Sequence, residues 1–298
     1  MKVIIKRTLQ ETLKPFPIIF VIVASVIGGL ILRFTEEFVR VPAFNSFLNE
    51  RLMEQHLVMF FLINGAVLIN IVSSVSSGLI ASEEHEGTLR ILVTKPNSRV
   101  QILAAKIIGM WIGIMILMLM GIFLTISIEM LFSNLDGNIL NAYLRYVPGY
   151  ILYGIIVTMF FSSLGTLLSC IMKRKVLAYI PLMLLMVIIL GIPIVARMIT
   201  DTTQIALVDL NYHFGSMFLW CLERCGEVTS DSSTMQVFMI LTNALKVVAE
   251  DIDITHGNDV RMIVKNNAIP VVLLLIGYVV LSAVNYLGSF LIIRKKNI

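Results

Sequence analysis

The 298-residue chain is 58% hydrophobic and only 14% charged, and its mean hydropathy is +0.91. Because about a quarter of the residues are charged in an ordinary soluble domain, this composition excludes a soluble protein, and the high hydrophobicity excludes a disordered one. A net charge of +4 would favour nucleic acid as a partner in a soluble protein, but in a membrane protein basic residues gather on the cytoplasmic face. We therefore expect one membrane domain covering residues 1–298, with no nucleic-acid partner.

Six charge-free apolar runs are long enough to cross a bilayer, which requires about 20 helical residues. They are residues 15–32, 57–80, 107–128, 147–172, 176–196 and 269–293. The first run is longer than the apolar core of a signal peptide, and five more follow it, so we expect it to remain in the protein. The sequence predicts an all-α integral membrane protein with six transmembrane helices.

The orientation follows from the positions of the basic residues, which are retained on the cytoplasmic side during insertion. If both termini are cytoplasmic, that side holds fourteen of the 23 Lys and Arg residues but only four of the 19 Asp and Glu residues. The outer side is then net negative. We expect a multi-pass protein of the cell (plasma) membrane with both termini in the cytoplasm and lipid around its spans.

The long outer segment, residues 197–268, contains two apolar stretches at 205–222 and 235–249. If both crossed the membrane, the net negative linker between them would lie in the cytoplasm, against the charge rule. The first stretch also contains Asp209 and His213, which are costly in lipid, and the second is too short to span. We expect a helical extracytoplasmic segment between spans five and six, with partial re-entry into the membrane left open.

Residues 1–14 place Ile5, Leu9 and Leu13 at helical spacing on one side and basic residues on the other. This pattern is typical of a helix that lies in the membrane interface. The alternative is an ordinary basic flank that satisfies the charge rule. The stripe persists over three turns, so we expect an N-terminal interfacial helix.

The loop between spans two and three, residues 81–106, shows clear signals for a short helix. Gly87 can end the helix that leaves the membrane, and Thr88 can cap a new one whose apolar face includes Leu89 and Leu92. A helix this short cannot bury an apolar face against itself. Either another protein covers that face or the face dips into the lipid interface, and the residues alone leave both open.

The end of the same loop predicts where the next helix begins. Pro96 and Asn97 stop the short helix, and Ser98 with Gln101 has the form of a capping box. We expect the following helix to begin there, with Lys106 at headgroup level as it enters span three.

One set of residues in this loop occurs in a distinctive order. The set is Glu83, Glu84, Gly87, Thr88, Leu89, Leu92, Pro96, Ser98, Arg99 and Lys106. It resembles the signature of ABC-2 type transporter permeases: an acidic pair, Gly-Thr-Leu, Pro-x-Ser-Arg, and a Lys entering the third span. The layout of the whole chain is also similar to that family, in its branch with separate permease and ATPase polypeptides.

The resemblance implies a permease subunit, most often an exporter, whose residues 83–94 form a coupling helix that docks into a groove on a cytosolic ABC ATPase. It implies two six-span units around one pathway, in a homodimer or a heterodimer. Carboxylates would pair with basic groups on the ATPase, and leucines would fill its groove. The implied docking residues are Glu83, Glu84, Gly87, Thr88, Leu89 and Leu92.

The chain has no G-x-x-x-x-G-K-[ST] motif to cradle a phosphate and no cytoplasmic stretch long enough for a nucleotide-binding fold. We therefore expect no catalytic residues and no cofactor here, and ATP hydrolysis on the partner subunit.

Polar residues within the spans are few. No ionisable residue lies in the middle of a predicted span, which weighs against ion-coupled transport. Asn70, Ser74 and Ser77 share one helix face in span two and are candidates for lining the pathway, although such residues more often join helices together. The outer histidines His56 and His213 lack metal-ligand spacing, so we expect surface histidines and no metal.

Two other classes of function remain open at this stage. One is an intramembrane lipid-modifying enzyme, which would need a base or metal at membrane depth beside a Ser or Cys nucleophile. The other is a non-transporting membrane anchor or sensor whose outer segment binds a ligand.

Overall fold

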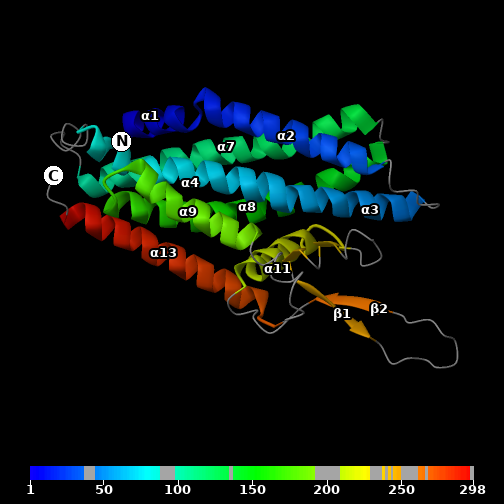
Figure 1. Cartoon of the computed structure of the whole chain (residues 1–298). Coiled ribbons are helices and arrows are strands. Elements are labelled where there is room, and N and C mark those ends of the chain that lie inside the picture. The colour runs from blue at the N-terminus through cyan, green and yellow to red at the C-terminus, as the bar shows by residue number, and fades with distance from the viewer. Residues whose placement is uncertain are drawn as a thin grey trace.

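The computed structural model shows an elongated bundle of helices (Figure 1). Helix α1 (Lys2–Thr12) and the last residues of α13 (Val271–Lys295) lie at one end, which we call the terminal end. Helix α3 (Phe44–Leu57) and the strands lie toward the other, distal end. The described residues are 1–36, 44–87, 98–133, 137–191, 209–228, 237–238, 241–242, 244–249, 261–265 and 268–295.

Helix α1 packs along the first turns of α7 (Arg99–Ser133) through small residues. A Cβ atom on Gly109 would lie 2.7 Å from the Ile5 carbonyl oxygen, and one on Gly113 would lie 2.6 Å from Thr12. Thr8 and Thr12 are buried, and their hydroxyls bond to carbonyls one turn back. Helix α1 therefore contacts α7 through buried threonines that lie against glycines of α7, as well as through apolar residues. The location of α1 in the membrane interface remains a prediction.

The second predicted span forms one continuous helical rod with an unusual middle. After α3, residues Val58–Val67 form a π-helix, η1, and α4 (Leu68–Gly78) continues it. In η1, Gly65 permits a close backbone approach, because a Cβ there would lie 2.6 Å from the Phe60 carbonyl oxygen. Helix α2 (Pro15–Glu36) runs beside this rod and α7.

Helices α7 and α8 (Gly137–Ile171) are the longest, with 35 residues each. Helix α8 is central and packs against both α4 and α13. Gly165 of α8 brings it close to α4, since a Cβ on this residue would lie 2.7 Å from the Cβ of Ser76. Close contact through small residues is the usual way in which membrane helices associate, because lipid provides no hydrophobic drive.

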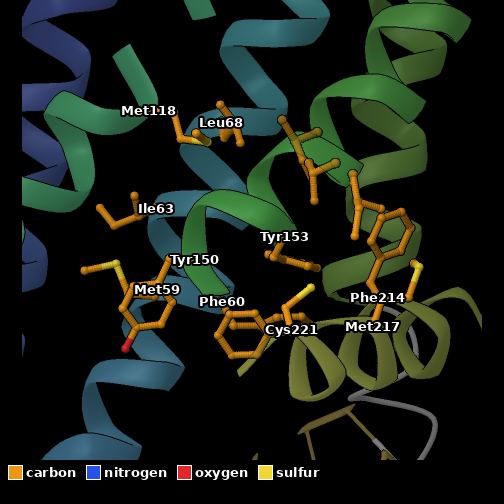
Figure 2. Close-up of a cluster of buried hydrophobic side chains, with 14 of the residues drawn as sticks. Met59, Phe60, Ile63, Leu68, Met118, Tyr150, Tyr153, Phe214, Met217 and Cys221 are labelled. Carbon is orange, nitrogen blue, oxygen red and sulfur yellow. The ribbon is translucent and has the colours of Figure 1, made fainter. Parts of the chain in front are cut away.

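Helix α11 (Leu210–Glu223) confirms a helix in the first apolar stretch of the outer segment. The carboxylate of Asp209 caps it by accepting a hydrogen bond from the backbone N–H of Tyr212 at 3.1 Å. The ring of Phe218 lies 4.9 Å from that of Tyr153 and 5.1 Å from that of Phe60, so α11 packs into the aromatic core beside η1 and α8. Figure 2 shows Phe214, Met217 and Cys221 of α11 in this core. Helix α11 contacts the part of α8 that corresponds to the predicted fourth span.

The outer segment is not wholly helical, which corrects the prediction. Strands β1 (Leu245–Ala249) and β2 (Arg261–Lys265) pair in antiparallel register, with Leu245 opposite Lys265 (Figure 1). β1 occupies the end of the stretch 235–249, where a helix was expected. Its Val-Val pair favours an extended strand, and pairing with β2 supplies hydrogen bonds that local sequence cannot reveal.

Five of the six predicted spans correspond to helices long and apolar enough to cross a membrane. These helices cover Pro15–Phe34, Leu48–His85, Arg99–Leu131, Ile139–Ile171 and Val271–Lys295. Helix α9 (Lys175–Leu190) stands at the predicted fifth span and is apolar but only 16 residues long, and the rest of that prediction lies outside the described residues. A sixth crossing therefore remains a prediction.

Candidate functional site

The predicted coupling loop leaves α4 through a short helix that is fastened to α8. Two residues separate helix α5 (Ala81–His85) from the end of α4. The backbone N–H groups of Ile80 and Ala81 donate to the hydroxyl of Ser169 at 2.9 and 3.0 Å. One side chain of α8 thus caps the break between the two helices and fixes where α5 begins.

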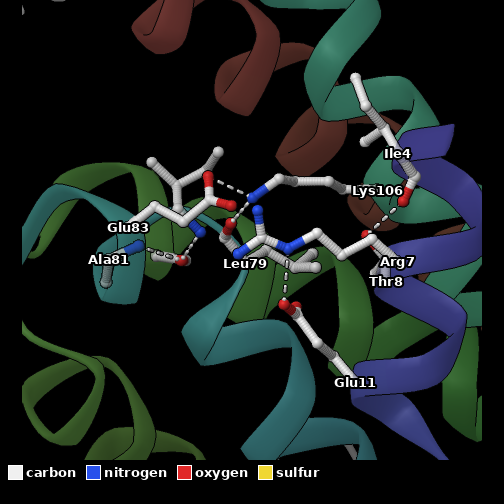
Figure 3. A network of polar contacts seen from close by, with 10 residues as sticks. Ile4, Arg7, Thr8, Glu11, Leu79, Ala81, Glu83 and Lys106 are labelled. Atoms are coloured by element: carbon white, nitrogen blue, oxygen red, sulfur yellow. Dashed lines mark hydrogen bonds and ion pairs between the residues drawn. The ribbon is translucent and has the colours of Figure 1, made fainter. Parts of the chain in front are cut away.

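An ion pair then holds α5 to α7 (Figure 3). The ammonium group of Lys106 contacts the carboxylate of Glu83 and donates to the carbonyl oxygen of Leu79 at 2.6 Å. Both charged side chains are buried. Lys106 was expected at headgroup level, which stays a prediction, and its buried contacts with the start of the loop were not foreseen. A buried pair of this kind is costly to break, because either charge left alone lacks solvation.

Gly87 stands just past the end of α5, as predicted. Its φ of +73° is in the left-handed region, which residues with a Cβ atom rarely adopt. No atom lies within 4 Å of the place where a Cβ would stand. Backbone conformation alone therefore requires glycine at this position.

Replacing Gly87 with Ala is expected to lower the free energy of unfolding by about 1 kcal/mol, because alanine must adopt a left-handed conformation. Chemical denaturation in detergent measures this change. Gly137→Ala is the matched control, since a Cβ there also meets no atom within 4 Å and its φ is not positive. An equal loss in both variants would show that Gly87 is not under backbone constraint.

The six predicted docking residues fall into three groups in the structure. Glu83 is buried in its ion pair, and Glu84 is partly buried on the same short helix. Gly87 is exposed at the end of the loop's described part. Thr88, Leu89 and Leu92 lie outside the described residues. The predicted capping box at the start of α7 is confirmed. Ser98 and Gln101 exchange hydrogen bonds of 3.1 and 3.2 Å.

The three candidate pathway residues of α4 have different surroundings. The Asn70 amide accepts a hydrogen bond from the Tyr179 hydroxyl of α9 at 3.3 Å, and the Ser77 hydroxyl bonds to the Ser74 carbonyl oxygen at 3.1 Å. These contacts join helices or satisfy the backbone, as polar residues in membrane helices commonly do. Ser74 differs, because it lines a cavity at the terminal end. Pathway lining by the three residues remains a prediction.

A buried polar cluster near the distal end was not predicted from the sequence. The guanidinium of Arg51 is fully buried and donates to the Leu32 carbonyl oxygen at 2.5 Å and to Glu54 at 3.0 Å. Nearby in the fold, the Tyr143 hydroxyl donates to the buried carboxylate of Glu129 at 2.5 Å. Arg51 and Glu54 share α3 at a spacing of three residues, but Leu32 and Arg51, like Glu129 and Tyr143, come from different helices, so no local spacing indicates that those pairs meet.

The histidines that were predicted to lie on the outer surface also differ from expectation. His56 is 2% exposed, and its Nδ1 lies 2.7 Å from the Tyr150 hydroxyl. His213 is 8% exposed and lies 3.2 Å from the Tyr278 hydroxyl. Both were expected on the surface, and each instead joins a tyrosine of another helix within the core. Among the described residues, no group of three or more His, Cys, Asp or Glu side chains is arranged to hold a metal ion.

The arrangement is a helical bundle in which the start of a loop is clamped at the terminal end. No curated protein matches the chain. The profile of the family described as ABC-2 family transporter protein matches residues 65–286, which cover most of the spans and the whole loop. Because the match includes well over half of the residues, the chain belongs to the ABC-2 family of transporter proteins and is a multi-pass membrane permease.

Proposed function

We propose that the chain is the permease subunit of an exporter, that two such subunits enclose the pathway, and that a separate cytosolic ATPase drives it. Membership of the ABC-2 family supports a membrane permease of an ABC transporter and association with an ABC ATPase. Export, the dimer and the cytosolic location of both termini go beyond that finding. In this proposal the ATPase lies at the terminal end of the bundle.

The observation that carries the proposal is the clamped start of the loop between α4 and α7. A docking element transmits force only if its base is fixed, and here Ser169 and Lys106 fix α5 from two different helices. Glu83 acts in docking by holding α5 in place. The rest of the segment then faces the ATPase: Glu84 presents a carboxylate, Gly87 and Thr88 form the turn, and Leu89 and Leu92 supply an apolar face. Binding of a helix in a groove suits such a segment.

Replacing Glu84 with Lys is expected to abolish copurification of the ATPase, because the substitution places a cation opposite the basic groups that we propose on the partner. The tagged protein is purified from its native membrane in mild detergent, and the recovered ATPase is measured by mass spectrometry and by ATP hydrolysis.

The control for this experiment is Glu227→Lys, which makes the same change in charge on an exposed residue near the distal end. It is expected to retain the ATPase in full. Stoichiometric ATPase recovery with Glu84→Lys would contradict the docking role of the loop, and an equal loss with both variants would point to a general charge effect.

A further inference from the structure

A cavity of about 470 Å³ lies at the terminal end, bounded by α1, the start of α2, α4, α5, α7 and the first residue of α9. Figure 3 shows part of its wall, where Arg7, Glu11, Glu83 and Lys106 lie close together. The cavity stands where spans one, two, three and five begin or end. It is therefore at the level of one membrane surface.

Most of the charges that line the cavity are already paired. Arg7 forms an ion pair with Glu11 at 3.1 Å, and Lys106 binds Glu83. The remaining cations are Lys14 and Lys175, and within the described part of the chain neither ammonium group has a hydrogen-bond or ion-pair partner. The remaining carboxylate, Glu86, is exposed on the α5 side. The cavity thus carries two cations that form no ion pair with an acidic side chain of the described residues.

Packing against α4 helps to hold the Lys175 side chain at the cavity. Its aliphatic stem lies against Gly78, where a Cβ would stand 3.3 Å from the Lys175 Cδ. Burial and the nearby positive charge of Lys14 both lower the pKa of Lys175, which stands one residue before the predicted fifth span. Two like charges are held close together here, an arrangement that a bound anion would stabilise. The Ser74 hydroxyl lines the same cavity and can donate to that anion.

The cavity also has an apolar side that continues along the membrane-facing surface. Phe16 lines it at the start of α2 and is 77% exposed. Beyond Phe16, α2 exposes Ile19 and Val23, and α9 exposes Val176 and Ile180 next to Lys175. A soluble anion would use only the charged part of this site, whereas a phospholipid would use both parts.

We propose that this cavity binds the phosphate of an anionic phospholipid between Lys14 and Lys175, with its acyl chains along the exposed faces of α2 and α9. The cavity shares Glu83 with the proposed docking element, but lipid binding is measured without the ATPase, so the lipid site stands or falls separately from the proposed function. A bound lipid would join α1, α4 and α9 at the membrane surface.

The test measures lipid binding to the purified full-length chain by native mass spectrometry, with phosphatidylglycerol, phosphatidylcholine and inorganic phosphate as probes. The variant is Lys14→Gln with Lys175→Gln. Each lysine near a lipid surface contributes about fivefold to the affinity for an anionic lipid, so the double variant is expected to lose at least about tenfold for phosphatidylglycerol. Phosphatidylcholine binding is expected to change little, because it is zwitterionic.

The matched control is Lys6→Gln with Lys173→Gln, which removes two exposed cations at the same end of the bundle without touching the cavity. It is expected to retain phosphatidylglycerol affinity within about twofold, since charges in solvent are screened by salt. Equal losses in the two double variants, or no loss in either, would overturn the site. Displacement of phosphatidylglycerol by an equal concentration of inorganic phosphate would overturn the lipid assignment in favour of a soluble anion.

Discussion

Replacing Glu83 with Leu is expected to lower the free energy of unfolding by about 3 to 5 kcal/mol, because it leaves the buried ammonium group of Lys106 without its counter-charge. Lys106→Met is expected to cost a similar amount, since it strands the carboxylate. The double variant is expected to be more stable than either single variant, because two apolar side chains can fill the space without an isolated charge. Chemical denaturation in detergent, arranged as a double-mutant cycle, measures the coupling.

The exposed pair of Arg7 and Glu11 is the natural control for this cycle. Its side chains retain 56% and 44% of their exposure, and its atoms lie 3.1 Å apart. Glu11→Leu is expected to cost less than about 1 kcal/mol, because solvent screens exposed pairs. If the single costs at Glu83 and Lys106 simply add in the double variant, the two residues do not stabilise each other and the clamp on α5 is wrong.

Replacing Gly165 with Val is expected to destabilise the fold by about 3 kcal/mol, at the upper end of the usual cost of overpacking. A Cβ at this position would lie 2.7 Å from the Cβ of Ser76 and 3.1 Å from Leu182, so α8 would have to move away from α4 and α9. Gly165→Ala is expected to cost less but to remain clearly destabilising. The midpoint of thermal unfolding in detergent measures both variants.

Gly277 of α13 provides the matched comparison, because a Cβ there meets no atom within 4 Å. Gly277→Ala is expected to leave stability unchanged or to raise it slightly, since alanine favours the helix and nothing obstructs it. Similar melting temperatures for Gly165→Ala and Gly277→Ala would mean that α4 and α8 are not in close contact.

The parts of the fold that depend on local sequence could be predicted. The lengths of the charge-free runs correctly predicted the five helices that are long and apolar enough to cross a membrane. A bilayer requires about 20 apolar residues from each span, whatever its neighbours are. Gly87 and the pair Ser98 and Gln101 were also assigned correctly, since helix ends are set by backbone groups that only nearby residues can satisfy. These residues mark the end of α5 and the start of α7.

The parts that depend on distant residues could not be predicted. Glu83 meets Lys106, and Tyr143 meets Glu129, only after helices from different parts of the chain have packed. The same holds for the strand at Leu245–Ala249, which needs β2 as a partner. Burial of His56 follows from the position of Tyr150 on another helix. Pattern and composition specify which residues are apolar, but they do not specify which polar groups will find each other.

Besides the contact with Ser169 of α8, the loop is attached to α7 at two points. The capping box starts α7 at Arg99, and the Glu83 contact reaches the same helix at Lys106, two turns further along, or about 10 Å. A push on the loop residues between Glu83 and Ser98 would apply a force at the first residue of α7. The contact of Lys106 with Glu83 would restrain the helix further along. Force and restraint at separate points form a turning couple, so the 35-residue helix would act as a lever about 52 Å long, converting a small displacement at its tip into tilt.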